Sequence, residues 1–145
     1  MNARTALAAP ALLLAAGVTL TGCSAYESLV HKQSTSAFDD VAAFRQGAEV
    51  DAEWLPADAT EITVRTSTVD KAADAVILLT SASPLVGDCA EVERYSAPSW
   101  TLDGAPDPYD AKTVFACGDW SVIETGTGWF GWTPNSDEER SAAVG

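Results

Sequence analysis

Alternating apolar and polar positions predict two neighbouring strands in the middle of the chain. In residues 60–66, Ile62 and Val64 face one way while polar side chains face the other, which is the pattern of a half-buried strand. Residues 75–80 are apolar on both faces and so predict a more central strand. A turn-like segment at residues 69–71 separates the two stretches, and we expect them to pair in antiparallel fashion.

Three further apolar-rich runs predict a meander towards the C-terminus. They cover residues 113–117, 120–125 and 129–133, and glycine-bearing turns separate them at residues 118–119 and 126–128. Short runs joined by glycine turns are typical of hairpin-connected strands. The sequence therefore predicts three consecutive antiparallel strands in this region.

The turn lengths decide which side chains of the meander share a face. A two-residue first turn and a three-residue second loop would gather six side chains on one buried face, namely Phe115, Cys117, Trp120, Val122, Phe130 and Trp132. Trp129 would then lie on the opposite face. A two-residue second turn would instead move Phe130 and Trp132 across the sheet, because a one-residue slip flips every side chain. The clustering of apolar groups favours the first register.

The remaining segments predict one helix and little other regular structure. Ser36 with an acid three residues later, and Gly47 at the end of the apolar spacing, predict a helix at about residues 37–46. Prolines spread through residues 81–112 exclude long elements there. Residues 135–145 are charged and have nothing to bury, so we expect a flexible tail.

The N-terminus has the layout of an export signal. An apolar run at residues 6–20 follows Arg4 and ends in Leu20-Thr-Gly-Cys23, and it is shorter than the roughly 20 residues that span a bilayer. Its end matches the lipobox of secretory lipoproteins, so we expect residues 1–22 to be a signal peptide and Cys23 to be lipidated. An ordinary secretory signal with a free Cys23, or an uncleaved signal anchor, is the alternative.

The mature chain is expected to divide into three parts. Residues 23–35 are polar and without periodicity, and would form a lipidated tether reaching up to about 40 Å. Residues 36–134 would form a single α+β domain, with a short N-terminal helix packed on an antiparallel β-sheet of about five strands. The flexible tail would follow. The acyl chains on Cys23 would hold the protein in the lipid bilayer, on the extracytoplasmic face of the cell membrane.

The net charge indicates which partners the chain can bind, and the cysteine content indicates whether it forms a disulfide. The chain carries 21 acidic and 8 basic residues, a net charge of −13, so nucleic acid is not an expected partner. With Cys23 assigned to lipid, Cys89 and Cys117 are left in an exported chain, and we expect a disulfide between them. On the chain-entropy model such a bridge contributes about 3 to 4 kcal/mol. A metal-binding pair or a reactive thiol is the alternative.

The sequence offers little for catalysis. A His-assisted nucleophile needs a histidine in the folded domain, whereas the only histidine, His31, falls in the expected tether. No phosphate-binding glycine motif is present. Acid pairs such as Glu91 with Glu93, or Asp107 with Asp110, are what glycan hydrolysis requires, but close acids are expected by chance in a chain this acidic. No catalytic residue and no cofactor is therefore expected.

The aspartates and the tryptophans are the other residues of the chain that could form a binding site. The aspartates between residues 103 and 110 depart from the EF-hand spacing, so no metal site is expected there. Most of the five tryptophans are expected to pack in the core. Trp100, in the proline-rich segment, and Trp129, off the expected buried face, are the candidates for binding a ligand.

Part of the sequence resembles a group of bacterial proteins. Trp54-Leu-Pro-Ala-Asp-Ala-Thr-Glu-Ile62, then Cys89, then Cys117-Gly-Asp-Trp120 are similar to stretches in small uncharacterised lipoproteins of high-GC Gram-positive bacteria, of the actinobacterial type. The resemblance spans roughly residues 54–133 and the lipobox. It implies the outer face of the cytoplasmic membrane as the location, and it brings no activity or site residue with it.

The function expected from the sequence is binding rather than catalysis. An acidic, aromatic-rich domain on a tether, without a catalytic motif, is typical of a non-enzymatic binding or interaction module of the cell envelope. Its partner would be an envelope protein or a glycan. The alternatives are a cell-wall glycan hydrolase that uses an acid pair and a structural accessory subunit with a flat apolar patch.

Overall fold

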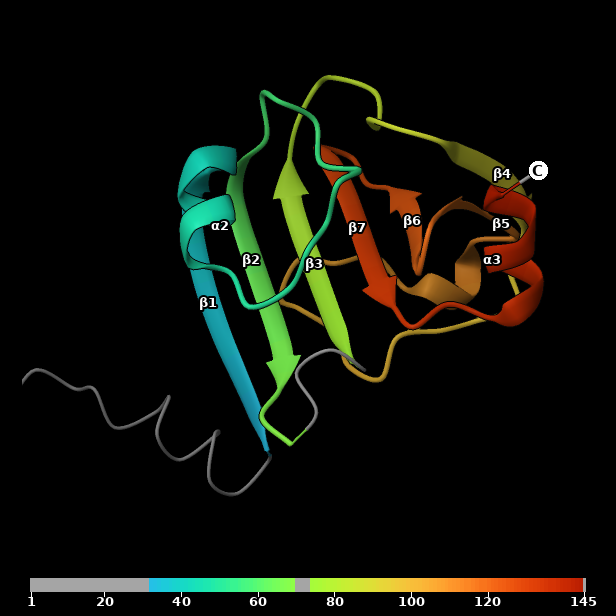
Figure 1. Cartoon of the computed structure of the whole chain (residues 1–145), viewed down its shortest axis with the longest axis horizontal. Helices are drawn as coiled ribbons and strands as arrows, with labels where there is room; N and C mark the ends of the chain where they lie inside the picture. The colour runs from blue at the N-terminus through green and yellow to red at the C-terminus, as the bar shows by residue number, and fades with distance from the viewer. Residues whose placement is uncertain (1–31, 70–73, 145) are drawn as a thin grey trace, which may run out of the picture.

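A computed structural model describes residues 32–69 and 74–144. One antiparallel sheet of seven strands forms its centre, in the order β1-β2-β3-β7-β6-β5-β4 (Figure 1). The strands are β1 (Gln33–Asp40), β2 (Thr60–Ser67), β3 (Ala75–Thr80), β4 (Cys89–Glu93), β5 (Thr113–Cys117), β6 (Trp120–Glu124) and β7 (Gly128–Thr133). The helices are α2 (Val41–Gly47), the 3₁₀ turn η2 (Pro108–Asp110) and α3 (Asp137–Ala143).

The expected signal peptide, Cys23 and most of the expected tether lie outside the described residues. Within the ranges that the structure describes, no helix has both the length and the apolar character needed to cross a bilayer. The α+β class and the single disulfide are confirmed. The number of strands and the place of the helix in the chain are not as predicted.

A strand, rather than a helix, comes first in the described chain. β1 pairs with β2 from Gln33 opposite Ser67 to Asp40 opposite Thr60. Most of its side chains are polar and exposed at the edge of the sheet, but Phe38 packs edge-on against Phe44 of α2. Backbone hydrogen bonds to β2 and this one partly buried ring hold the strand in place. The prediction of a tether as far as residue 35 is therefore wrong for residues 33–35.

The helix begins four residues later than predicted because a different residue caps it. The carboxylate of Asp40 accepts a hydrogen bond from the Ala43 amide at 2.8 Å, which satisfies one of the free donors at a helix N-terminus. α2 then buries Val41 and Phe44, which lie three residues apart on one face. Ser36, the predicted cap, lies inside β1.

The first turn of the meander has the predicted register, and the second does not. Cys117 lies opposite Trp120 and Phe115 opposite Val122, as expected. In the second hairpin Ile123 pairs with Phe130, because the turn has two residues and the Thr125 amide donates to the Gly128 carbonyl at 2.8 Å.

Phe130 and Trp132 therefore lie on the opposite face from Val122 and Trp120. The register predicted from clustering is wrong, because clustering assumed that only one face of the sheet is buried. In fact both faces are covered, and each has its own apolar core.

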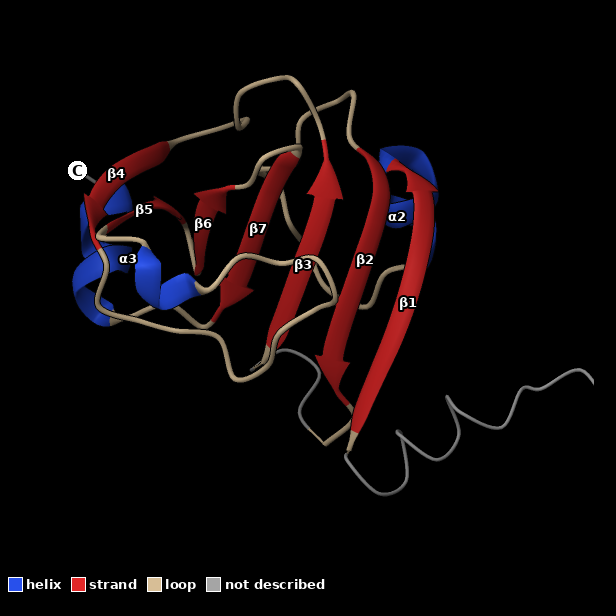
Figure 2. Ribbon diagram, turned by 180° about the vertical axis from the view of Figure 1, so that it is seen from behind, coloured by secondary structure: helices blue, strands red, loops and turns tan. Residues whose placement is uncertain are grey.

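The two faces have different covers, and we name them accordingly. On the helix face, α2 and residues 48–59 lie over the sheet (Figure 1). The sheet residues buried there include Ile62, Val64, Ile77, Leu79 and Val122. On the loop face, residues 94–112 cross the sheet (Figure 2). The sheet residues buried there are Val76, Val114, Ile123, Phe130 and Trp132.

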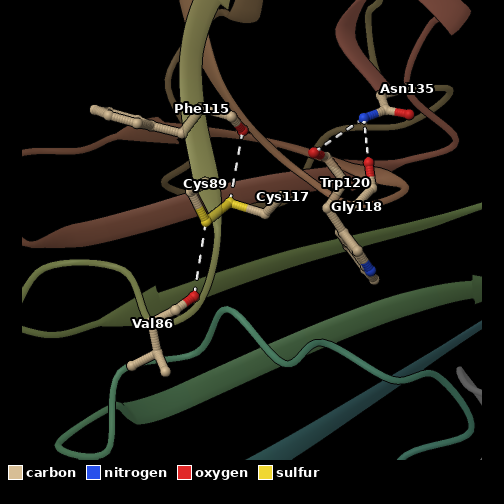
Figure 3. Close-up of a disulfide and its surroundings, with 7 residues drawn as sticks. All are labelled: Val86, Cys89, Phe115, Cys117, Gly118, Trp120 and Asn135. Carbon is tan, nitrogen blue, oxygen red and sulfur yellow. Dashed lines mark hydrogen bonds between the residues drawn. A yellow bond between two sulfur atoms is a disulfide. The ribbon is translucent and has the colours of Figure 1, made fainter. Parts of the chain in front are cut away.

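The C-terminal residues are folded, so the prediction of a flexible tail is wrong for the described residues 135–144. Asn135 is buried, and its side-chain amide donates to the carbonyls of Gly118 (2.8 Å) and Trp120 (3.1 Å) (Figure 3). Ser136 caps α3, and its hydroxyl accepts from the amide of Glu139. This segment is anchored by buried polar side chains, which a prediction based on hydrophobic residues does not detect.

The fully buried side chain of Glu139 accepts five hydrogen bonds, and the four from Tyr95, Ser96 and Ser121 join α3 to β6 and to the segment after β4. The donors are the Tyr95 amide (2.7 Å), the Ser96 amide (3.0 Å), the Ser96 hydroxyl (2.6 Å), the Ser121 hydroxyl (2.9 Å) and the Ser136 amide (2.9 Å). Burial alone would raise the pKa of Glu139. The hydrogen bonds from Ser96, Ser136, Tyr95 and Ser121 outweigh it, and the net pKa is lowered.

The predicted disulfide is present and joins two strands. Cys89 and Cys117 lie directly opposite each other in β4 and β5, with an S–S distance of 2.04 Å (Figure 3). The Cys89 sulfur also lies 3.7 Å from the Val86 carbonyl oxygen. The bridge therefore fastens the edge strand β4, which begins after a long irregular segment, to the rest of the sheet.

Candidate functional site

The strand register defines one end of the sheet as distal from the start of the domain. Asp40, at the end of β1, lies opposite Thr60, which lies opposite Thr80, which lies opposite Gly128. These residues lie at the same end of their strands, one full strand length away from Gln33, where the described domain begins (Figure 1). We call this end of the sheet the distal end.

A hollow of about 710 Å³, which we call the distal hollow, lies at this end. It is lined by the segment that follows β3 and by the hairpin between β6 and β7, with residues Thr80, Ser81, Ala82, Ser83, Pro84, Glu124, Thr125, Gly126, Thr127, Gly128 and Trp129. Five of these residues bring hydroxyl groups, one brings a carboxylate and one brings an indole. The hollow therefore offers hydrogen-bonding groups beside one aromatic surface.

Trp129 is fixed within the wall of the distal hollow. Its indole N–H donates to the Ser83 carbonyl at 3.0 Å, and its ring packs edge-on against Phe115 with centroids 5.8 Å apart. Gly128 is required beside it, because a Cβ at this position would collide with the Leu79 carbonyl oxygen. The indole is partly exposed, so it presents a held surface rather than a mobile one.

The two sides of the distal hollow are tied together by short polar contacts. The Ser81 amide donates to the Thr127 carbonyl at 3.0 Å, and the Ser81 hydroxyl donates to Asp58 at 2.6 Å. That hydrogen bond is the main reason that the pKa of Asp58 is lowered, and a further one from Ser83 adds to it. Asp58 thus holds the serine-rich rim in place as a carboxylate.

A second hollow adjoins the first, and we call it the neighbouring hollow. Its volume is about 430 Å³. Four acids line it, namely Glu91, Asp107, Asp110 and Glu124. Glu124 lines both hollows, while Phe115 of the neighbouring hollow contacts Trp129 of the distal one. The two hollows therefore share one lining residue, Glu124, and touch through the contact between Phe115 and Trp129.

The structure separates the two tryptophans that the sequence singled out. Trp129 lines the distal hollow, but it packs with the apolar core of the helix face and not on the side expected. Trp100 is partly exposed within residues 94–112, on the loop face, and lines neither hollow. Trp100 and Trp129 therefore do not form one platform.

The two acid pairs considered from the sequence differ in where they lie. In the pair Glu91 and Glu93, only Glu91 lines the neighbouring hollow, and Glu93 accepts a hydrogen bond from the Tyr95 hydroxyl at 3.0 Å. That hydrogen bond is the main reason that the pKa of Tyr95 is raised. Asp107 caps η2 by accepting from the Tyr109 amide at 2.9 Å, and it lines the neighbouring hollow together with Asp110.

Among the described residues, no group of three or more His, Cys, Asp or Glu side chains is placed to hold a metal ion. Comparison of the chain with protein-family models, with curated proteins and with solved structures finds no match.

Proposed function

We propose that this chain is a membrane-anchored lipoprotein of the extracytoplasmic face, whose domain is a non-enzymatic module that binds a glycan of the cell envelope. The observation that carries the proposal is the position and lining of the distal hollow. It lies at the end of the sheet opposite Gln33, and the lipobox at Cys23 precedes Gln33 by only ten residues. A domain held at one end by lipid would present this hollow away from the membrane.

The lining of the distal and neighbouring hollows suits a sugar chain. Sugars combine apolar C–H faces with many hydroxyl groups, and an indole beside donors and acceptors complements both. Trp129 supplies the aromatic surface, and the serine, threonine and acidic side chains supply hydrogen bonds. Two adjoining hollows that share Glu124 fit an extended polymer better than a compact ligand.

Co-sedimentation of three proteins tests glycan binding at the distal hollow. The purified full chain in detergent should co-sediment with isolated cell-wall glycan, and Trp129→Ala should reduce the bound fraction at least tenfold. Trp100→Ala is the matched control, because Trp100 lines neither hollow, and it should bind as the wild type does. Equal binding by all three proteins would exclude the distal hollow as the site.

The lipid anchor needs a separate test. Growth with labelled palmitate should label the wild-type protein, and Cys23→Ala should abolish the label. Labelling that survives this substitution would contradict the assignment of Cys23.

One observation favours a second candidate, a glycan hydrolase. Glu91, Asp107, Asp110 and Glu124 gather around the neighbouring hollow, and hydrolysis by an acid pair needs two carboxyl groups about 5 to 10 Å apart. This candidate predicts release of reducing ends from cell-wall glycan, abolished by Glu91→Gln or Glu124→Gln. The binding module predicts no release at all.

A further inference from the structure

The two edge strands of the sheet differ in how they are protected. β4, at one edge, is short and has exposed carboxylates at Glu91 and Glu93. β1, at the other edge (Figure 2), has neither a charged residue nor a proline from Gln33 to Phe38. Short length, charges and prolines are features that keep edge strands from pairing with other chains. Residues 33–38 of β1 therefore form an unprotected edge.

The direction of the backbone groups of β1 follows from a hydrogen bond at its start. The Thr68 amide donates to the Lys32 carbonyl at 2.8 Å, so the N–H of Gln33, in the same trans peptide unit, points away from β2. Backbone direction alternates along an antiparallel strand. Gln33, Thr35 and Ala37 therefore direct their N–H and C=O groups outward, and the residues between them pair with β2.

These outward backbone groups are accessible. Thr35 and Ala37 are exposed and Gln33 is partly exposed, and no hydrogen bond from any described residue reaches the outward groups. They repeat every second residue, about 7 Å apart. A row of paired donors and acceptors at this spacing matches the backbone of another extended chain.

A hollow of about 290 Å³ adjoins this edge on the helix face, and we call it the edge hollow. Its lining residues are Ser34, Ser36, Phe38, Gly47, Ala48, Glu49, Val64 and Thr66. Phe38 is only partly buried there. Every second side chain of an added strand would lie on this face. Main-chain hydrogen bonds together with pockets for alternate side chains are a recurring means of recognising extended peptides.

We propose that β1 binds an extended, neutral or basic segment of another polypeptide, which adds to the sheet as a further strand antiparallel to β1. The backbone of the segment pairs with Gln33, Thr35 and Ala37. Its alternate apolar side chains lie beside the edge hollow, against Phe38. Antiparallel pairing brings the N-terminal end of the segment to the end of β1, where a basic side chain lies opposite the exposed carboxylate of Asp39.

A second copy of the chain fits this edge less well. Symmetry would pair the two β1 strands antiparallel and would direct the two distal ends in opposite ways, whereas a common membrane requires both to point away from it. Two chains of net charge −13 also repel each other. The choice of a partner polypeptide rests here on the proposed lipid anchor, while the unprotected edge does not depend on it.

Backbone-methylated peptides test the assigned hydrogen bonds. The probe is acetyl-Lys-Val-Thr-Val-Thr-Val-Thr-amide, titrated calorimetrically into the full chain in detergent. With its lysine opposite Asp39, its threonine N–H groups face β1 and its valine N–H groups face solvent. N-methylation of the first two threonines should weaken binding at least tenfold, because two hydrogen bonds are lost.

The matched control is the peptide that is N-methylated at its first two valines, and its affinity should stay within about threefold of the unmethylated probe. Equal losses for the two methylated peptides, or a loss for the valine set alone, would overturn the proposal. So would the absence of binding by the unmethylated probe at millimolar concentration.

Substitutions at one outward position localise the binding. Ala37→Pro removes an outward N–H, which an edge strand tolerates, and it should weaken the probe at least tenfold. Ala37→Ser keeps the N–H and should bind within twofold of the wild type. Thermal unfolding confirms that both variants are folded. Equal binding by the two variants would place the peptide elsewhere and contradict the proposal.

Two further measurements separate this site from the alternatives. Trp129→Ala, in the distal hollow, should bind the probe as the wild type does, so failure of the glycan proposal leaves the strand site standing. Sedimentation velocity of the full chain in detergent should show no dimer. A dimer that Ala37→Pro dissociates would assign the edge to a second copy and would overturn the proposed partner.

Discussion

The helix face and the loop face of the sheet are both buried, but the segments that cover them hold on by different means. The cover of the helix face contributes seven buried apolar side chains, namely Val41, Phe44, Ala52, Trp54, Leu55, Pro56 and Ala59. The cover of the loop face, residues 94–112, contributes two, Leu102 and Pro108. Residues 94–112 are irregular, so they present no regularly spaced row of apolar side chains that could pack on the sheet.

Directional polar contacts take the place of apolar area on the loop face. Arg65 donates to the Thr101 carbonyl at 3.0 Å, and Arg94 donates to the Ser96 carbonyl at 2.9 Å. The Trp132 indole donates to the Ser96 hydroxyl at 2.8 Å, and the same hydroxyl donates to Glu139. The comparison shows that one sheet can carry a cover held by burial and a cover held by a buried carboxylate and its donors.

The largest loss of stability is expected for a substitution in the segment that covers the helix face. Phe44→Ala removes a ring that is 3% exposed and packs edge-on against Phe38, and it should reduce the free energy of unfolding by about 4 kcal/mol. Urea denaturation measures this loss. A loss below about 1 kcal/mol would mean that burial does not hold the helix face.

On the loop face, replacing the buried carboxylate of Glu139 should reduce the free energy of unfolding slightly less. Glu139→Gln leaves several buried donors without an acceptor and should cost about 3 kcal/mol at neutral pH. Glu138→Gln, at the exposed neighbouring position, is the control and should change stability by less than about 0.5 kcal/mol. If the two substitutions cost the same, the buried network does not hold α3.

The two covers should also differ in their response to pH. The pKa of Glu139 is lowered from its ordinary value of 4.5, so its contribution is fully present above that value and is lost as the pH falls through the depressed pKa. The stability difference between the wild type and Glu139→Gln should therefore shrink on acidification. The difference between the wild type and Phe44→Ala should stay constant, and urea denaturation at several pH values between about 3 and 7 compares them.

The smallest effect is expected from the N-terminal cap of α2 on the helix face. Asp40→Ala removes the cap of α2 and should cost about 1 kcal/mol, because the buried side chains of the helix remain. Asp39→Ala changes an exposed neighbour that does not cap, and thermal unfolding should barely distinguish it from the wild type. A larger loss for Asp39→Ala would place the cap on the wrong residue.

Strands with an apolar pattern were predictable, and a strand without one was not. β2, β3 and the three strands of the meander follow from alternation and glycine turns, and the bridge follows from the cysteine count. β1 lies at the edge of the sheet and has a single partly buried large apolar side chain, Phe38, among polar residues, so alternation of apolar and polar positions could not reveal it. The predicted register of the second hairpin was wrong because Phe130 and Trp132 are buried under residues 94–112, an irregular segment whose pattern does not predict that it covers a face of the sheet.

The C-terminal helix was visible in principle. Ser136 and Glu139 have the spacing of a capping box, a signal hidden by the surrounding charges. Its partners Ser96 and Ser121 lie far away in the sequence, and no local pattern foretells them. Trp129 lines the distal hollow, and its role in binding stays a prediction, whereas the serine and threonine side chains of that hollow come from segments that only the fold brings together.

The position of β1 also bears on mechanics. If lipid holds Cys23 and a wall polymer occupies the distal hollow, tension enters the domain at Gln33 and leaves it at the opposite end of the sheet. The hydrogen bonds between β1 and β2 lie across this direction, from Gln33 opposite Ser67 to Asp40 opposite Thr60. A pull along the strand therefore loads them all in shear, so an edge strand with little apolar burial can still serve as the bearing element between membrane and wall.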